Sequence, residues 1–418
     1  MSAENSRAGA GPEESPRNQV IAQPSGGDFD VIILGGGTIG MAAAYYAAAR
    51  GLKALLLEQY DFANRFASSC GVSRMFRVMY SPEFMGRLAE TTLGLWKEIE
   101  AASRVEILLQ QPLLFYGDAE STVEGNLGEL KTIMATLGVP YSWYPTVADL
   151  MQGFPVFRKG MPTDYVGVAQ PNSAVIRADR SILAFESLAR KAGAVLMNDQ
   201  PAAITTISTE GPYRVSCPAG DFFTRRLILC PGAWTNKVLQ PFDIQLDLKI
   251  WQMTVAYFQA DVSHYNYPLW YEFGPPVGPN AQQQLFYGFP PDEAPGQIKV
   301  SADFTNNIYT DPEECTYRPD PKIISALGTF LTNRFNGVAA QPAQASTCLY
   351  TMTSDAQMIL DRLPGHPNVS IFTGGSGRGF KFTPLFGRIL VELAMTGNSG
   401  YAISPFSITR RGIITKHP

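Results

Sequence analysis

The chain has 418 residues, a formal net charge of −4 and 45% apolar residues, the composition of an ordinary globular protein with room for two or three domains. It has three histidines and no basic run, which argues against a nucleic-acid partner. No segment reaches the length of about 18 apolar residues that a membrane span requires. We therefore expect a cytoplasmic protein without a membrane partner. A peroxisomal location stays open, although the last residues, TKHP, are not an S-K-L-type address.

Residues 1–27 are rich in Ser, Gly, Pro, Glu and Ala and lack the apolar core of a signal peptide, so we expect a disordered tail. The odd number of cysteines and the lack of C-x-x-C spacing disfavour a disulfide framework. No histidine has a metal-ligand or catalytic-triad neighbour. We expect no metal site, and any catalysis should depend on an organic cofactor.

A dinucleotide-binding fingerprint follows the tail. The apolar run 31–34 predicts a strand, and Gly35, Gly37 and Gly40 follow it at G-x-G-x-x-G spacing. In that motif the first glycine makes a tight turn, the second admits a pyrophosphate, and the third lets the helix pack on the sheet.

The helix after this turn and the strand after the helix complete the pattern. Thr38 and Ile39 lie where the first N–H groups of the helix would face phosphates. The next apolar run, 55–57, ends at Glu58, about 20 residues on, where an acid would accept hydrogen bonds from an adenosine ribose. An acid there argues against NADP but leaves FAD and NAD open.

Further along the chain, elements of two kinds alternate. A helix is expected around 88–101, strands and short helices in 111–165, and an N-capped amphipathic helix within 175–194. A buried strand, LILC, runs into Pro231-Gly232. Aromatic-rich strands of an antiparallel sheet are expected in 246–344.

The last segment predicts a return to the nucleotide domain, with a buried strand and glycine-rich exit at 368–375 and a helix ending at Gly397. We therefore predict an α/β fold, α+β overall, with a Rossmann-like domain interleaved with a mostly antiparallel substrate domain. The nucleotide domain would comprise residues 28–110, 166–245 and 345–418, and the substrate domain residues 111–165 and 246–344.

Seven motifs carry a family resemblance: SSCGVSRMFRVMY, LILCPGAWTN, LFYGFP, QIKVSADF, STCLYTMTSD, GFKFTPLFGR and SPFSITR. They resemble the monomeric sarcosine oxidase and pipecolate oxidase family, flavoenzymes of the D-amino-acid-oxidase-like superfamily. FYGF, STCL and FKFTPLFGR are also similar to a member of that family, the nikkomycin-pathway piperideine-2-carboxylate oxidase. The resemblance spans the chain after residue 28 and selects FAD as the cofactor.

The resemblance implies that the FAD is covalent, through a thioether from Cys348; a buried structural cysteine is the alternative. Further cofactor contacts carried over from the family are Ser69, Cys70, Arg74, Gly232, Trp234, Gly375, Gly377, Gly379 and Lys381.

The resemblance also implies catalytic residues. Arg77 and Lys381 match a clamp for the substrate carboxylate, a group that arginine binds well. Arg74 matches an arginine beside the flavin, and Lys299 matches a lysine that activates oxygen. From the residues alone, two alternatives remain: Arg74 and Arg77 form an exposed cationic face, and Lys299 is a solvated lysine. Tyr287 and Tyr350 would line the pocket, although strand aromatics are more often core.

Three positions depart from the sarcosine oxidases, which place histidines where this chain has Cys70, Asp303 and Arg378. These differences put sarcosine itself in doubt as the substrate. We expect Arg378 to pair with Asp303, because a buried unpaired arginine is costly. The alternative is that Arg378 binds a second acidic group on the substrate.

The resemblance implies a covalent-FAD oxidase of secondary or cyclic amino acids, such as pipecolate, a piperideine carboxylate or an N-alkyl amino acid. It would oxidise the C–N bond to an imine and reduce O2 to hydrogen peroxide. A saccharopine-type oxidase acting on N-dicarboxylalkyl amino acids, a flavin dehydrogenase that uses an electron carrier and a non-catalytic flavin-binding protein remain alternatives. We expect a monomer.

Overall fold

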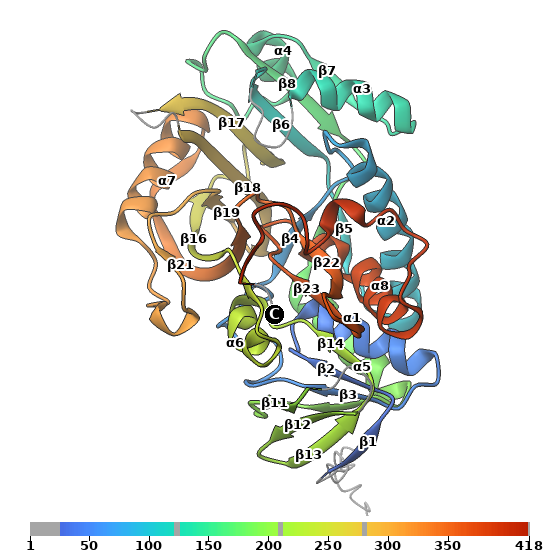
Figure 1. Ribbon diagram of the computed structural model, residues 1–418. Coiled ribbons are helices and arrows are strands. Elements are labelled where there is room, and N and C mark those ends of the chain that lie inside the picture. The colour runs from blue at the N-terminus through green and yellow to red at the C-terminus, as the bar shows by residue number, and fades with distance from the viewer. Residues whose placement is uncertain (1–25, 121–125, 208–211, 278–281, 417–418) are drawn as a thin grey trace, which may run out of the picture.

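The computed structural model describes residues 26–120, 126–207, 212–277 and 282–416. Almost all of the expected tail, residues 1–27, lies outside the described residues. The described chain forms two lobes, each built on its own large sheet (Figure 1). Among the described residues, no helix combines the length and the apolar character needed to cross a bilayer.

The first lobe is built on a six-stranded sheet in which five neighbouring strands are parallel and the edge strand is antiparallel. In sheet order the strands are β10 (Val195–Met197), β3 (Ala54–Leu57), β2 (Val31–Leu34), β14 (Leu227–Leu229), β23 (His366–Thr373) and β22 (Ile359–Leu363). The fingerprint strand β2 lies inside the sheet between β3 and β14, and the strands expected near residues 227 and 368 lie next to each other on one side of it. The chain therefore returns to this sheet twice, as expected.

Both faces of this sheet are covered, which explains why β10, β3, β2 and β14 are apolar throughout. Val31 and Ile33 pack against helices, whereas Ile32 and Leu34 pack toward a second, smaller sheet. The helices are α1 (Thr38–Ala49), α2 (Glu83–Ser103), α5 (Ala178–Lys191) and α8 (Thr383–Thr396). The smaller sheet consists of β1 (Gly27–Phe29), β13 (Gly220–Thr224), β12 (Tyr213–Cys217) and β11 (Ala203–Thr206).

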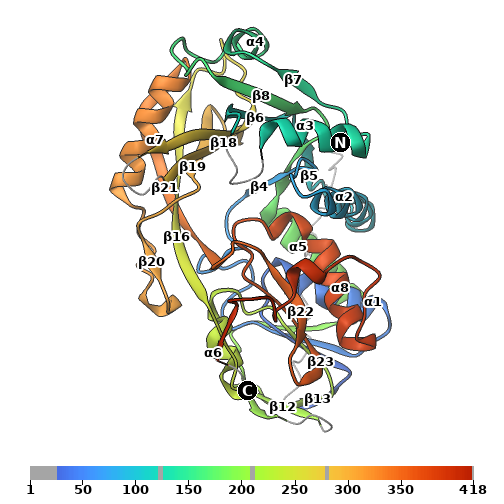
Figure 2. The same ribbon diagram turned by 45° about the horizontal axis from the view of Figure 1, so that its top comes forward.

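The second lobe is a nine-stranded, mostly antiparallel sheet. Its strands are β20 (Ile308–Tyr309), β16 (Leu248–Ala260), β19 (Gln297–Ala302), β18 (Gln282–Ala294), β17 (Leu269–Val277), β6 (Leu113–Asp118), β8 (Tyr165–Gln170) and β7 (Ser142–Tyr144), with β21 (Val338–Thr353) paired to β16. Strands β6 and β17 pair in parallel. Figure 2 shows β16 and β21 running side by side toward the first lobe.

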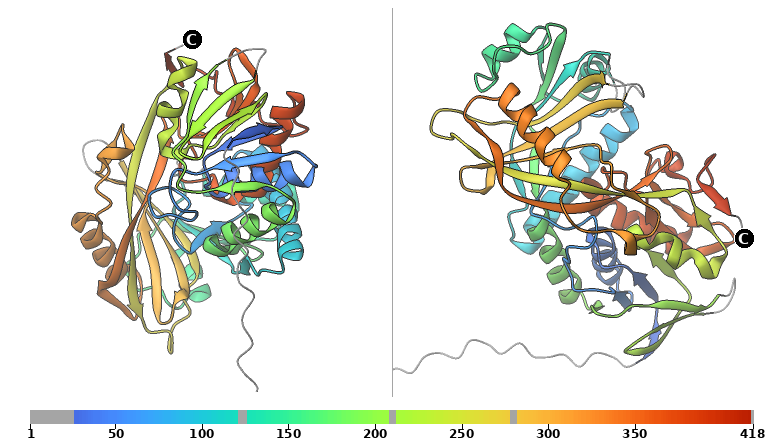
Figure 3. Two further views of the ribbon diagram at one scale, coloured as in Figure 1. Left: turned by 90° about the horizontal axis from the view of Figure 1, so that it is seen from below. Right: turned by 90° about the vertical axis from the view of Figure 1, so that its left-hand side faces the viewer.

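One face of this sheet is closed by a helix and the other faces the first lobe. Ile323, Leu327 and Leu331 of α7 (Pro321–Arg334) pack on the outward side chains of the sheet (Figure 3). Two further helices, α3 (Leu127–Leu137) and α4 (Val147–Gly153), accompany β6–β8. Strands β8 and β21 extend the antiparallel sheet beyond the boundaries expected at residues 165 and 345, and the domain ranges remain a prediction.

A small sheet and a short helix connect the lobes. The small sheet comprises β4 (Ser73–Phe76), β9 (Ala174–Arg177) and β5 (Leu108–Gln110). The 3-10 helix Gly232–Trp234 and α6 (Thr235–Leu239) follow β14.

The expectation that the helix within 175–194 has a side-chain N-cap is wrong. Helix α5 starts after Arg177 without a capping side chain, because the nearby acid, Asp179, lies inside the first turn.

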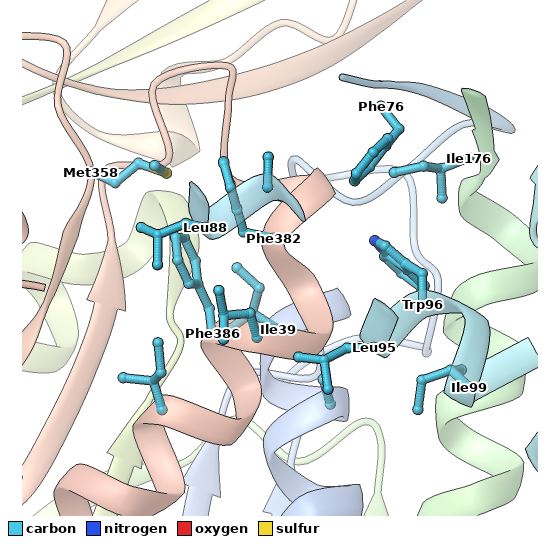
Figure 4. Close-up of a cluster of buried hydrophobic side chains, with 14 of the residues drawn as sticks. Ile39, Phe76, Leu88, Leu95, Trp96, Ile99, Ile176, Met358, Phe382 and Phe386 are labelled. Atoms are coloured by element: carbon cyan, nitrogen blue, oxygen red, sulfur yellow. The ribbon is translucent and has the colours of Figure 1, made fainter. Parts of the chain in front are cut away.

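The core of the first lobe contains a tight helix crossing. Figure 4 shows Ile39 of α1, Leu88 and Leu95 of α2 and Phe386 of α8 converging in it. Beside Phe386, a Cβ added at Gly387 would lie 2.6 Å from the Cβ of Ala42 and 2.8 Å from its carbonyl carbon. Only a glycine lets α8 approach α1 this closely.

Gly387→Leu should therefore destabilise the fold by about 1–3 kcal/mol or more, through overpacking at the backbone of α1. Gly94→Ala is the matched control, since open space surrounds this exposed glycine of α2. The control should gain about 0.5–1 kcal/mol from reduced backbone entropy. Thermal unfolding of both variants measures the difference, and equal melting temperatures would contradict the tight crossing.

Candidate active site

The glycine turn between β2 and α1 has the backbone conformation and close contacts that the fingerprint predicts. Gly35 has φ +103°, and a Cβ on it would lie 2.2 Å from the carbonyl oxygen of Cys230. A Cβ on Gly40 would lie 1.9 Å from the carbonyl oxygen of Gly35. Replacing either glycine would push α1 away from the strands and disrupt the turn that opens onto the adjoining cavity.

Glu58, at the end of β3, has its carboxylate fixed by the same turn. One oxygen accepts from the N–H of Gly36 at 2.7 Å and the other from the N–H of Tyr60 at 3.0 Å. Burial raises the pKa of Glu58, while these N–H groups favour its charged form. Near the start of α1, the N–H of Thr38 donates to the hydroxyl of Ser69 at 3.1 Å.

A long cavity extends from this turn, with about 1320 Å³ of atom-free space, open solvent included. Most of the cofactor contacts expected from the sequence line it. They are Gly35, Gly37, Thr38, Ile39, Gly40, Glu58, Ser69, Arg74, Gly232, Trp234, Gly375, Gly377 and Gly379. Glycine backbone at one end, a buried acid and aromatic walls suit a dinucleotide, so the residues present fit FAD.

A second cavity of about 780 Å³ adjoins the first, because Arg74, Tyr350, Ser376, Gly377 and Phe380 line both. All seven expected catalytic residues line the second cavity. They are Arg74, Arg77, Tyr287, Lys299, Asp303, Arg378 and Lys381. Cys348 lines the second cavity as well, two residues before Tyr350, which lines both cavities.

Strand alternation explains how one short segment supplies several of these groups. In β19 the side chains of Ile298, Val300 and Ala302 pack outward toward α7. Lys299 and Asp303 therefore project to the opposite side, into the second cavity. Tyr287 of β18 pairs in register with Ser301 of β19, which aligns it between them.

Arg77 and Lys381 are buried cations, 4% and 7% exposed, and both lie near the ring of Tyr80. The Arg77 guanidinium lies 4.2 Å and the Lys381 ammonium 5.7 Å from the centre of the Tyr80 ring. The indole N–H of Trp96 on α2 donates to the carbonyl oxygen of Lys381 at 2.8 Å. The core of the first lobe thus fixes the backbone that carries Lys381.

Arg74 binds the loop that precedes it. Its guanidinium donates to the carbonyl oxygens of Ser73 at 2.7 Å, Ser68 at 2.9 Å and Cys70. It also stacks over Phe380, 5.1 Å from the ring centre. This geometry differs from the exposed cationic face considered from the sequence, because Arg74 and Arg77 both point into the protein.

Cys348 lines the second cavity, and Cys70 lies close to it. The Cys70 thiol contacts the carbonyl oxygens of Ala67 at 3.2 Å and Thr347 at 3.8 Å, and it lies outside both cavity linings. Burial, and next the neighbouring Cys70, raise the pKa of Cys348 to about 11. Arg74 and Lys299 act in the opposite direction.

Lys299 is held by an acid that was not expected from the sequence. Its ammonium donates to Glu293 at 3.0 Å and to the Ser73 hydroxyl at 2.9 Å. Burial lowers the pKa of Lys299, partly offset by Glu293. Burial would raise the pKa of Glu293, but Lys299 and its hydrogen bonds make the net direction downward. The solvated-lysine alternative is therefore wrong.

Asp303 and Arg378 do not form the expected pair. Asp303 accepts a hydrogen bond from the hydroxyl of Tyr271 at 2.6 Å, and the Arg378 guanidinium donates to the carbonyl oxygen of Ala356. Tyr271, also unexpected, stacks on Tyr287 with the ring planes 11° apart.

Comparison with known proteins supports the assignment of the first cavity to FAD. The family model for FAD dependent oxidoreductases matches residues 30–393. The chain is 30% identical to the human peroxisomal sarcosine oxidase over 393 residues, 91% of this chain and 96% of that protein. It is also 30% identical to the monomeric sarcosine oxidase of Bacillus sp. strain B-0618 over 388 residues, 91% and 96% of the two chains.

The chain belongs to the FAD-dependent oxidoreductases, within the monomeric sarcosine oxidase family. A solved structure of NikD, described as an unusual amino acid oxidase essential for nikkomycin biosynthesis, matches with a TM-score of 0.81 and 29% identity. That match covers 91% of this chain and 97% of NikD. The family confirms FAD as the cofactor and the chain as a flavin-dependent amino acid oxidase of the sarcosine oxidase type.

Proposed function

We propose that this enzyme oxidises secondary or cyclic amino acids, such as pipecolate, a piperideine carboxylate or an N-alkyl amino acid, to the imine with release of hydrogen peroxide. The observation that carries the proposal is the pair of buried cations, Arg77 and Lys381, in one wall of the cavity that adjoins the dinucleotide cavity. Two buried cations at that position favour an anionic substrate group.

In this proposal Arg77 and Lys381 bind the substrate carboxylate and thereby orient the carbon–nitrogen bond toward the junction of the cavities. Both cations lie against the ring of Tyr80, which is itself buried. FAD held in the first cavity would supply the redox chemistry: it would accept a hydride equivalent from the carbon next to the substrate nitrogen, the nitrogen would lose a proton, and the two electrons would pass to O2, which with two protons gives hydrogen peroxide. Lys299 lies in the same cavity, where its charge would stabilise reduced oxygen by preorganised electrostatics.

Cys348 is the proposed attachment point of the cofactor, because it lines the second cavity and lies two residues before Tyr350, which lines both cavities. The thiolate is the reactive form of cysteine, and burial keeps this thiol protonated up to about pH 11. Attachment would therefore be slow at neutral pH. The positive charges of Arg74 and Lys299 favour the thiolate and so assist the reaction.

The cavity fits a substrate larger or more polar than sarcosine. Asp303 and Arg378 both line it, and within the described chain the Arg378 guanidinium is held by a neutral carbonyl group. That arrangement favours binding of a second acidic group of the substrate by Arg378 over pairing of Arg378 with Asp303. A saccharopine-type N-dicarboxylalkyl amino acid is accordingly the second candidate substrate.

Arg77→Met should lower kcat/KM on a carboxylate substrate by about 30-fold to several thousand-fold, since breaking a buried charge contact costs about 2–5 kcal/mol. The flavin should stay bound. Arg87→Met is the matched control, because Arg87 is exposed and paired only along α2 with Glu83. Steady-state kinetics that are unchanged in Arg77→Met would exclude its role in carboxylate binding.

Acid-precipitated wild-type protein should stay yellow, and Cys348→Ser should release its flavin into the supernatant. Cys217→Ser serves as the control, because Cys217 lies in the small sheet away from both cavities. When FAD is added to apoprotein, the rate of attachment should rise about tenfold per pH unit below the thiol pKa. A colourless wild-type pellet would refute the covalent link.

Arg378→Ala should lose more kcat/KM on N-dicarboxylalkyl amino acids than on pipecolate, because only the dicarboxylate has a second anionic group to lose. For each substrate, kcat/KM of Arg378→Ala is divided by kcat/KM of the wild type, and the two ratios are compared. Equal losses on both substrates would mean that Arg378 only shapes the pocket.

A further inference from the structure

A bulge in β18 lies directly beside the strand that carries Lys299. Phe289 pairs with Lys299, and Ala294 pairs with Gln297. Between these two pairs β18 has four residues and β19 has one, so β18 has three extra residues. The bulged residues are Pro290, Pro291, Asp292 and Glu293. Proline cannot donate to the ladder, which favours a bulge here.

The bulge directs two acids into the protein. Asp292 pairs with Arg177 of β9 at 2.7 Å, and Glu293 pairs with Lys299 at 3.0 Å. The side chains of Lys299 and Glu293 are only 7% and 5% exposed. A bulge beside a functional strand commonly redirects a side chain, and this one brings an anion to a buried cation.

Both members of the pair are fixed by further hydrogen bonds. The second oxygen of Glu293 accepts from the hydroxyl of Tyr257 at 2.6 Å. The Lys299 ammonium also donates to the hydroxyl of Ser73, at 2.9 Å, and to its carbonyl oxygen, at 3.3 Å. Strands β16, β18 and β4 therefore hold one buried polar network, with Lys299 of β19 at its centre.

The charges around Lys299 determine whether it keeps its proton. The titratable groups that act on it or on its partner are Glu293 of β18, Arg74 of β4, Cys348 of β21, Tyr257 of β16 and Cys70 of the preceding loop. Burial and Arg74 disfavour the ammonium, and Glu293 is the largest opposing influence. Without Glu293, a buried lysine beside an arginine would lose its proton readily.

We propose that Glu293 is a positioning residue for the oxygen reaction: its carboxylate keeps the Lys299 side chain charged and directed into the substrate cavity. This inference rests on the proposed role of Lys299. It adds a specific function for the bulge, which is to supply the counter-charge that a buried cation needs.

The test is the rate of reoxidation of the reduced holoenzyme by O2, measured by stopped flow across the pH range. In the wild type the rate should fall as the pH rises through the pKa of Lys299. In Glu293→Gln the same fall should occur at least about one pH unit lower, because the compensating charge is gone. Asp292→Asn, which alters the neighbouring acid of the bulge, should keep the wild-type midpoint.

Lys299→Met separates the two claims. It should reoxidise slowly with no such pH midpoint. If Lys299→Met reoxidises at the wild-type rate, the proposed role of Lys299 is wrong. If it is slow but Glu293→Gln has the wild-type midpoint, only the role of Glu293 is wrong.

Thermal unfolding gives a readout that is independent of activity. Glu293→Gln leaves a buried amine that is either charged without its counter-charge or forced to give up its proton, whereas Glu293→Gln combined with Lys299→Met removes that amine. The double variant should therefore melt above Glu293→Gln, even if the single variant folds poorly. A double variant that melts below Glu293→Gln would overturn the proposal.

Discussion

The architecture depends on burying several positive charges in one cavity wall. Arg77, Lys299 and Lys381 are each less than a tenth exposed, and Arg74 lies beside them. A buried charge is costly unless fixed partners compensate for it. The structure supplies such partners from both lobes: aromatic faces for Arg77, carbonyl groups for Arg74 and a carboxylate for Lys299.

The interleaved chain makes this convergence possible. The first lobe needs glycine at the β2–α1 turn and again at the α1–α8 crossing, where a side chain would separate the elements. The second lobe needs strict alternation in β19, so that α7 covers one face and the site forms on the other. The long pair β16 and β21 joins the lobes and brings Cys348 to the second cavity.

Much of this arrangement is predictable because it is local in sequence. The glycine spacing, the acid after β3 and the alternating strand around Lys299 identify their own structural roles. Contacts made by tertiary packing are not predictable in this way. Glu293 follows two prolines in an unremarkable turn sequence, and only the register of β18 shows that it points inward. The partner of Arg378 likewise depends on where the turn at Ala356 lies in space.

The most direct test of the account is an anaerobic titration of the purified flavoprotein with cyclic and N-alkyl amino acids, followed by addition of air. The account predicts that a cyclic or bulky secondary amino acid bleaches the flavin fastest and that air restores the colour with one hydrogen peroxide formed per substrate oxidised. Bleaching without peroxide formation would indicate a dehydrogenase. Sarcosine reacting faster than every cyclic or bulky candidate would contradict the assignment of the pocket.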